Sequence, residues 1–283
     1  MRGLKAGAAK KKKTAKTTDH FRLPIVCDAD TLRSLLRKKA VRVVDVRKAD
    51  DYGKGHVPTA VSLPLARVLE NDAPEKVIDI LEEIGVTDGM PVVVYDDTFG
   101  ALAARVAWTF QYVGHTNTAL LEMTFKQWKE LGLETEKRAH NFPRSEHPLA
   151  INAGIHADAK YVESAKSEQG KLLVDSRERL NFLTEHIPGA KNIPYTMVGS
   201  NGSILRKADE LKRMIENRGI SSDSEIITYC GSVGTLSGLT YYALKLAGFS
   251  NVKLYPKSFK EWKALGKPKE EFRDATYWDL SAE

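Results

Sequence analysis

The chain repeats its own sequence, and this repeat limits the possible folds more than any other feature. The stretches Val-Val-Asp-Val-Arg and Leu-Val-Asp-Ser-Arg are followed by His-Val-Pro-Thr-Ala and His-Ile-Pro-Gly-Ala, respectively. Ten identical residues recur in the same order, six of them at a spacing of 130 and four at a spacing of 134. They are Asp45/Asp175, Arg47/Arg177, His56/His186, Pro58/Pro188, Ala60/Ala190, Pro64/Pro194, Tyr95/Tyr229, Gly114/Gly248, Phe125/Phe259 and Trp128/Trp262. The chain is therefore a tandem duplication.

Each half alternates short apolar strands with helices. In the first half the valine-rich segments 41–46 and 91–95 predict strands, because β-branched residues favour extended backbone. Helical apolar spacing over 101–112 and 236–247, with a glycine shortly after each, predicts a helix in each half. Apolar strands that alternate with helices indicate a parallel sheet covered on both faces. We therefore expect two α/β domains.

The length of 283 residues fits two domains of ordinary size. Proline and polar residues without periodicity indicate a linker between the halves. The predicted organisation is a basic tail over 1–19, a first domain over 20–138, a linker over 139–153 and a second domain over 154–283.

The net charge of +6 comes from the N-terminal tail. Residues 1–18 contain seven bases and no acid, which leaves 36 bases and 37 acids, a net charge of −1, in residues 19–283. We expect the tail to be a solvated, disordered arm, and contact with RNA or a membrane, or a targeting role, stays open. The rest of the chain gives no reason to expect nucleic-acid binding. It has no apolar run of ~18 residues that could cross a membrane.

The chain has two cysteines, which cannot form a disulfide framework. This cysteine usage favours a reducing compartment, and we expect a cytoplasmic protein.

A cysteine opens a loop of small residues between a predicted strand and a predicted helix of the second half. The loop reads Cys-Gly-Ser-Val-Gly-Thr. Its glycines and serine let successive backbone N–H groups turn inward around an anion, and the helix N-terminus adds positive potential. Such surroundings favour the thiolate, which is the nucleophilic form, although a buried structural cysteine is the alternative. We predict Cys230 as the nucleophile and an anion-binding cradle of Gly231, Ser232, Val233, Gly234 and Thr235.

The first half has an aspartate at the corresponding position. Asp96 precedes Cys230 by 134 residues, and its loop continues Asp-Thr-Phe-Gly. An aspartate cannot supply a thiolate, and its charge would oppose an anion, so we predict that the first half is inactive. Cys27 has no glycine loop after it, and we expect it to be a buried cysteine without a chemical role.

Three features together carry a family resemblance: the two Asp-x-Arg motifs, the two His-x-Pro-x-Ala motifs and the Cys230 loop. With these features the chain resembles the tandem-domain rhodanese-type sulfurtransferases, the thiosulfate and 3-mercaptopyruvate sulfurtransferase family. The resemblance covers residues 20–283. It implies two tandem rhodanese-like domains, each a five-stranded parallel sheet flanked by helices, with only the second one catalytic. It also implies that Cys230 takes a sulfane sulfur from a small-molecule donor and passes it to a thiophilic acceptor, such as cyanide, a thiol or a protein. It implies neither a metal nor an organic cofactor.

The donor stays open, because the chain departs from the family pattern. The loop resembles that of the mercaptopyruvate group with Val233 and Gly234 exchanged, and it lacks the Arg-Lys pair of thiosulfate-specific relatives. The family's insert with substrate-binding arginines is absent, which leaves Arg179 as the nearest candidate. The lack of a cation in the loop favours mercaptopyruvate, a monocarboxylate, over the thiosulfate dianion. Lys257 lies near the matched Ser258 and would favour thiosulfate if it reaches the site.

The remaining motif residues have both structural and functional interpretations. We expect the Asp-x-Arg motifs to form partly buried ion pairs that tie a strand to a loop. In mercaptopyruvate-type relatives the first-domain histidine of the motif lies close to the interdomain site. His56 is therefore predicted to orient substrate, with a buried structural role as the alternative. The histidines show no ligand spacing, so no metal site is expected.

Two other functions compete with the sulfurtransferase. A phosphatase of this fold needs an arginine six positions after the cysteine to clamp phosphate, and Leu236 stands there instead. A sulfur-carrier module that accepts sulfur on Cys230 from a protein partner, without turnover, is the second alternative. The loop sequence does not separate this carrier from an enzyme.

Overall fold

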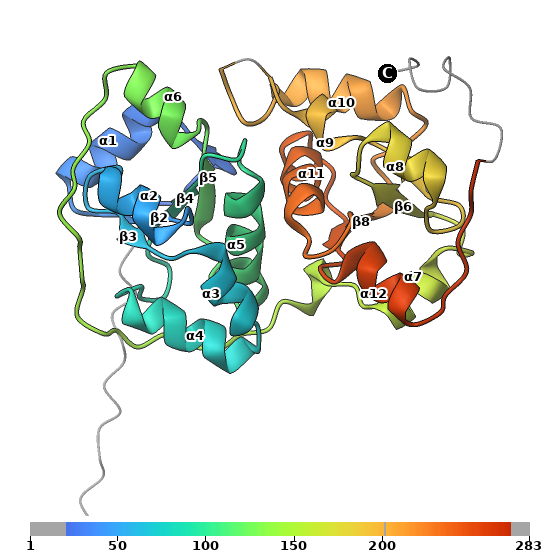
Figure 1. Ribbon diagram of the computed structural model, residues 1–283, viewed down its shortest axis with the longest axis horizontal. Helices are drawn as coiled ribbons and strands as arrows, with labels where there is room; N and C mark the ends of the chain where they lie inside the picture. The colour runs from blue at the N-terminus through green and yellow to red at the C-terminus, as the bar shows by residue number, and fades with distance from the viewer. Residues whose placement is uncertain (1–20, 201, 273–283) are drawn as a thin grey trace, which may run out of the picture.

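The computed structural model describes residues 21–200 and 202–272, so the basic tail expected over 1–19 lies outside the described residues. Figure 1 shows two α/β domains side by side, with α5 of the first facing α11 of the second at the centre. This arrangement confirms the expected pair of α/β domains. No helix in the described part of the chain combines the length and apolar character needed to cross a membrane.

The first domain contains one parallel sheet of five strands, in the order β1-β5-β4-β2-β3. Its elements are β1 (Val26–Cys27), α1 (Ala29–Arg37), β2 (Arg42–Asp45), α2 (Ala49–Lys54), β3 (Val61–Ser62), α3 (Leu65–Glu70), α4 (Pro74–Glu83), β4 (Val92–Tyr95), α5 (Ala101–Tyr112), β5 (Thr118–Leu121) and α6 (Phe125–Glu130). The central strands β2 and β4 are buried along their whole length, as the valine-rich segments predict.

The second domain repeats this order of elements. They are η1 (Ala153–Ile155), α7 (Ala159–Ala165), β6 (Lys171–Asp175), α8 (Arg179–Thr184), β7 (Lys191–Asn192), α9 (Tyr195–Val198), α10 (Ala208–Glu216), β8 (Glu225–Tyr229), α11 (Thr235–Leu246), β9 (Val252–Leu254) and α12 (Ser258–Ala264). All strand pairs are parallel, in the order β7-β6-β8-β9.

The sheet of the second domain has four strands among the described residues, not the expected five. At the position of β1 there is only a single parallel bridge between His156 and Leu254. The short helix η1 ends one residue before this bridge, and Asp158 caps α7 two residues after it by accepting the Tyr161 N–H. The chain between these two helical ends is too short for a longer strand.

The inner faces of the two domains share one apolar core. Trp108 and Phe110 of α5 belong to the same buried cluster as Tyr241 and Tyr242 of α11. Gly238 allows this close packing, because a Cβ there would meet backbone atoms of α5 at 3.4 and 3.5 Å. The outer faces have separate cores, which contain the buried Trp128 and Trp262. The inner faces of the two domains are therefore held together as one packed unit.

After α6 the chain runs along the outer side of the first domain before it enters the second (Figure 1). The Phe142 ring packs against the Arg42 guanidinium, whose carbon lies 3.1 Å from the ring centre. Further along, His147 Nε2 lies 2.9 Å from His115 Nδ1. The linker expected over 139–153 falls in this segment and contacts the first domain along its path.

Candidate active site

Both halves build the end of their central strand in the same way. Asp45 and Asp175 are buried at the ends of β2 and β6, and each lies 2.6 Å from the guanidinium of the arginine two residues later. Each arginine also donates to a carbonyl oxygen, that of Gly55 or Glu185. The predicted ion pairs therefore tie a strand to a loop in both domains. They fix the strand ends next to which Asp96 and Cys230 lie.

Cys230 follows β8 directly, and its side chain is buried with 2% exposure. The Ser258 hydroxyl accepts the Cys230 N–H at 3.1 Å and lies 3.7 Å from Cys230 Sγ. Its single proton can go to the Tyr255 carbonyl, 2.9 Å away, or to the sulfur. Ser258 has a left-handed backbone (φ 55°), which brings its hydroxyl to this place. A thiolate at Cys230 thus has a hydrogen-bond donor within reach.

The loop after Cys230 ends in a left-handed glycine. Gly234 has φ +76° and caps α11, as Gly100 with φ +87° caps α5. A Cβ on Gly234 would lie 3.1 Å from the Pro256 Cα and 3.4 Å from the Arg105 Cδ. Glycine is therefore required at 234, whereas Val233 is 38% exposed and unconstrained by such contacts. The order of valine and glycine in this loop therefore fits its backbone.

The first domain shows what the same loop does with an anion. Asp96 is fully buried, and its carboxylate accepts the backbone N–H groups of Thr98, Gly100 and Ala103 at 2.7, 2.9 and 2.9 Å. Burial raises the pKa of Asp96, and these N–H donors oppose that shift. The carboxylate is supplied by the loop itself and fills the cradle from within.

The second domain has the same N–H groups without the internal carboxylate. At the spacing of 134, the three donors correspond to the amides of Ser232, Gly234 and Ser237. No acceptor for these three amides is found among the residues that the structure describes. The second loop can therefore hold an anion that is not part of the loop itself.

A buried arginine from the first domain reaches the second-domain loop. Arg105 on α5 is 5% exposed, and its Nε donates to the Val233 carbonyl at 2.8 Å. Burial lowers the pKa of Arg105 to about 10, and the charges of Asp72 and Cys230 act in the opposite direction. The guanidinium is thus still charged at neutral pH, and Cys230 is one of the groups close enough to influence the pKa of Arg105.

A cavity of about 530 Å³ lies between the two domains next to this loop. Ser232 and Val233 line one side, and Arg105 and Trp108 of α5 line the other. Lys257 lines it as well, with a side chain that is 68% exposed and lies 3.3 Å from Glu261. The site is therefore made by both halves of the repeat, and its cations lie outside the cysteine loop.

Two of the predicted site residues lie elsewhere. Arg179 begins α8 and lines a separate cavity with Phe182 and Arg218. His56 is completely buried in the first domain, and its ring nitrogens lie close to the carbonyl oxygens of Tyr52 and Arg138. It does not line the cavity next to the cysteine loop, which Ser232 and Val233 line. The geometry fits the structural alternative for His56.

Cys27 is placed as the sequence predicts. It is completely buried at the end of β1. Burial, followed by the charges of Asp28 and Glu122, raises the pKa of Cys27 to about 12. It is therefore a thiol at neutral pH and cannot compete with Cys230 as a nucleophile.

Two segments of the chain, residues 28–131 and 158–265, match the profile described as the Rhodanese-like domain. The chain belongs to the rhodanese family. It is a tandem rhodanese, and this confirms both the resemblance found in its motifs and the expected enzyme class, sulfurtransferase.

The alignments with several relatives extend over most of both chains. This rhodanese is 28% identical to the "3-mercaptopyruvate sulfurtransferase" of Escherichia coli, over 83% of this chain and 94% of that protein. The crystal structure of that bacterium's SseA superposes with a TM-score of 0.75 at 27% identity, covering 84% of this chain and 99% of the other. The "Sulfur carrier protein TtuD" of Thermus thermophilus is 29% identical, over 84% and 93% of the two chains. The "Thiosulfate sulfurtransferase" of Pseudomonas aeruginosa is 25% identical, over 85% and 94%.

The sequence did not point to Arg105 as a site residue. Arg105 lies in a helix that is otherwise almost wholly apolar, and a lone cation buried in such a helix is the only signal of its role. His156 and Lys260 also line the cavity, and each comes from a different element of the second domain. Their contribution depends on packing between elements, which motif spacing does not report.

Proposed function

We propose that this rhodanese transfers a sulfane sulfur from 3-mercaptopyruvate to a thiophilic acceptor through a persulfide on Cys230. The observation that carries the proposal is the Asp96 carboxylate, which three loop amides hold in the inactive domain. The corresponding amides around Cys230 can hold the terminal sulfur of a persulfide anion in the same way. They provide this stabilisation through a rigid backbone and need no cation in the loop.

The first half-reaction forms the persulfide. The Cys230 thiolate attacks the sulfur of mercaptopyruvate, an S–S bond forms, and the C–S bond breaks with its electron pair going to carbon. The thiol proton of the donor then moves to that carbon, which gives pyruvate and the Cys230 persulfide anion. The Ser258 hydroxyl, 3.7 Å from Sγ, can donate to the thiolate before attack.

The second half-reaction restores the enzyme. Cyanide or a thiolate attacks the terminal sulfur, the S–S bond breaks, and its electron pair returns to Cys230 Sγ. With cyanide the product is thiocyanate. No metal or organic cofactor takes part in either half-reaction as proposed.

The cavity favours a donor with a single carboxylate. Arg105 is charged and buried at the cavity wall, and none of the ion pairs among the described residues includes it. The charge of Asp72, which lines the same cavity, acts on Arg105 without forming an ion pair with it, and a carboxylate of the donor would add a direct counter-charge. Lys257 and Lys260 add cationic character at the rim, which leaves thiosulfate as the competing donor.

The proposal is tested by steady-state kinetics with the purified full chain. Mercaptopyruvate and thiosulfate are each combined with cyanide, and kcat/KM is compared with that of Cys230→Ser. We expect turnover with both donors, a higher kcat/KM for mercaptopyruvate, and none in the variant. The resemblance to a sulfur carrier favours one alternative outcome, in which Cys230 is loaded with sulfur but does not turn over with any small acceptor. That outcome would replace the enzyme by the carrier, with a protein as the sulfur acceptor.

Both cysteines are free thiols, which supports the cytoplasm as the compartment of this reaction.

A further inference from the structure

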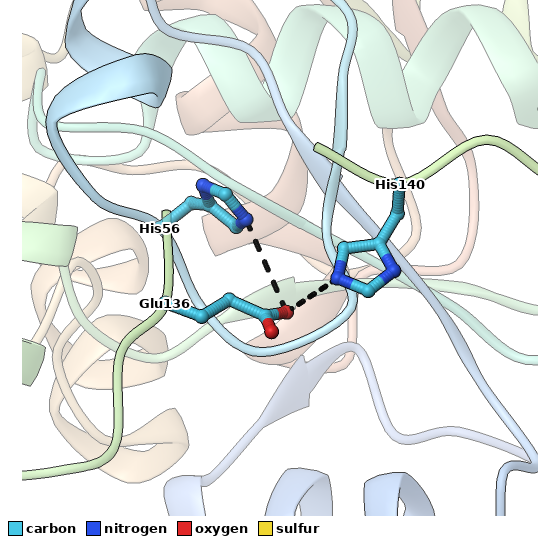
Figure 2. A group of neighbouring side chains, drawn as sticks. All are labelled: His56, Glu136 and His140. Carbon is cyan, nitrogen blue, oxygen red and sulfur yellow. Dashed lines mark ion pairs between the residues drawn. The ribbon is translucent and has the colours of Figure 1, made fainter. Parts of the chain in front are cut away.

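A cluster of potential metal ligands lies in the first domain, outside the sulfurtransferase site. Its members are His56, Glu136 and His140, whose ligand atoms all lie within 4.8 Å of one another (Figure 2). His56 comes from the motif loop of the first domain, and the other two come from the chain that leaves this domain after α6. An antiparallel bridge between His56 and Glu136 brings the two segments together.

The surroundings of His56 fix one ring nitrogen and leave the other facing oxygen atoms. Nδ1 lies 3.0 Å from the Tyr52 carbonyl, which can only accept, so Nδ1 carries a proton. The ring also stacks on Tyr52 with 3.9 Å between ring centres. Nε2 then points its lone pair toward the Arg138 carbonyl oxygen at 3.1 Å and toward Glu136 Oε1 at 3.9 Å. A proton on Nε2 would satisfy these oxygen atoms by hydrogen bonding, and a metal ion would satisfy them by coordination.

His140 favours the metal ion over the proton. Its Nε2 forms an ion pair with Glu136 Oε1 at 2.8 Å, and this buried nitrogen has no hydrogen-bond partner among the described residues. Its ring lies edge-on to that of His56. Two imidazole nitrogens therefore converge on one carboxylate without sharing a hydrogen bond.

We propose that His56, Glu136 and His140, together with the Arg138 carbonyl oxygen, bind one divalent cation of the zinc type. Ligand atoms of a tetrahedral zinc ion at about 2.0–2.2 Å lie roughly 3.3–3.6 Å apart. The separations of 2.8, 3.1 and 3.9 Å lie around this range, and all three side-chain ligand atoms lie within 4.8 Å of one another, so small side-chain shifts would complete the site. Two imidazoles and one carboxylate suit zinc better than the oxygen-preferring magnesium or calcium.

The groups around these ligands already have the orientation that a metal site requires. The Nδ1–H of His56 donates to a backbone carbonyl, which is the usual partner of a metal-binding histidine. Glu136 is held in place by the Thr59 N–H, which donates to its Oε1. The ion would fasten the segment 136–140 to the first domain.

The second domain provides a matched comparison. There His186 Nε2 lies 3.4 Å from Glu270, and His186 Nδ1 lies 2.8 Å from the Phe182 carbonyl, so the histidine–glutamate pair is repeated. Phe272 stacks on His186, and the described residues place no second histidine beside this pair. The repeated pair has a structural role in both domains, and His140 makes the first one different.

The test is a zinc titration of the untagged full chain carrying Cys230→Ser, because a free thiolate would also bind zinc. Isothermal titration calorimetry and native mass spectrometry should show one tightly bound Zn²⁺ per chain. We expect Glu136→Gln and His140→Ala each to weaken binding at least about tenfold. Glu270→Gln and His147→Ala, which alter the repeated pair and the other histidine pair, should leave the affinity unchanged.

A second measurement guards against loss of folding in the variants. Zinc should raise the unfolding temperature of the parent chain, and this rise should disappear in His140→Ala, whose 21% exposed side chain can be removed without opening the core. Absence of stoichiometric binding in the parent chain overturns the proposal. So does binding that persists in His140→Ala or that falls equally in Glu270→Gln.

Discussion

Replacing Arg105 by methionine tests whether the first domain supplies the anion-binding group of the proposed site. The substitution keeps a long side chain in the core and removes the charge and the hydrogen bond to the Val233 carbonyl, 2.8 Å away. A hydrogen bond that involves a charged group contributes roughly 1.5–3 kcal/mol. Since about 1.4 kcal/mol corresponds to a tenfold change, we expect kcat/KM for mercaptopyruvate to fall about 10- to 150-fold in Arg105→Met.

The pH dependence supplies an independent readout. The folded-state pKa of Arg105 is lowered to about 10 by burial, so its charge is lost as the pH rises through that value. Wild-type kcat/KM for an anionic donor should therefore decline near pH 10, and this decline should be absent in Arg105→Met. Burial disfavours the charged form in the folded state, so neutralising the residue removes a cost at lower pH. The unfolding temperature of the variant should accordingly not fall by more than a few degrees.

Two results would refute this reasoning. One is a kcat/KM of Arg105→Met within about twofold of wild type, measured by thiocyanate formation. The other is an equal fall for cyanide attack on a preloaded persulfide, which would place the defect outside donor binding. Arg105→Lys serves as the control, because it keeps the charge without the Nε donor and should lie between the other two.

Three further outcomes follow from the geometry. Iodoacetamide at about pH 8 should alkylate Cys230 and spare Cys27, because the Cys27 pKa of about 12 leaves only roughly one thiolate in ten thousand. Intact mass spectrometry after labelling checks this. Treatment with the sulfur donor should add the mass of one sulfur atom, and this addition should be absent in Cys230→Ser. Gly238→Leu should force α5 away from α11, lowering the stability by about 1–3 kcal/mol in denaturant unfolding and reducing kcat/KM. The control Gly53→Ala lies in helix α2 with no atom within 4 Å of the added carbon, so it should leave kcat/KM unchanged and should not lower the stability. An active and stable Gly238→Leu would contradict the packing. Lys257→Ala should change kcat/KM for mercaptopyruvate less than about threefold, because the ion pair between Lys257 and Glu261 is largely exposed. A wild-type preference for thiosulfate that is lost in this variant would show instead that Lys257 selects the donor.

Local patterns predicted the parts of the fold that depend on neighbouring residues. The helix expected over 101–112 is α5 to the residue, and the helix expected over 236–247 is α11 shifted by one. The valine-rich segments form the buried strands, and the Asp-x-Arg motifs form the expected ion pairs. In each case the deciding interactions lie within a few residues or within one strand pair.

The features that the sequence did not show depend on distant segments. Arg105 acts in a loop 128 residues away, because α5 and α11 pack across the two domains. The motif around His56 is the same in both halves, yet its ring faces Glu136 and His140, which the following segment brings to it. The shortened edge of the second sheet results from η1, which motif comparison does not detect. Spacing alone could not have revealed these contacts.

Asp96 keeps the anion-binding loop of the first domain permanently occupied, so this loop can serve as a reference for the corresponding loop of the second domain. Its carboxylate is tethered to the loop that binds it, so its effective concentration is the same whatever the supply of substrate. The amide of Gly100 therefore keeps its partner at all times. In the proposed reaction cycle, the amide of Gly234 would gain a partner when Cys230 is loaded with sulfur and lose it when the sulfur leaves. A spectrum that resolves both amides would report the sulfur load of one domain against the unchanging signal of its duplicate.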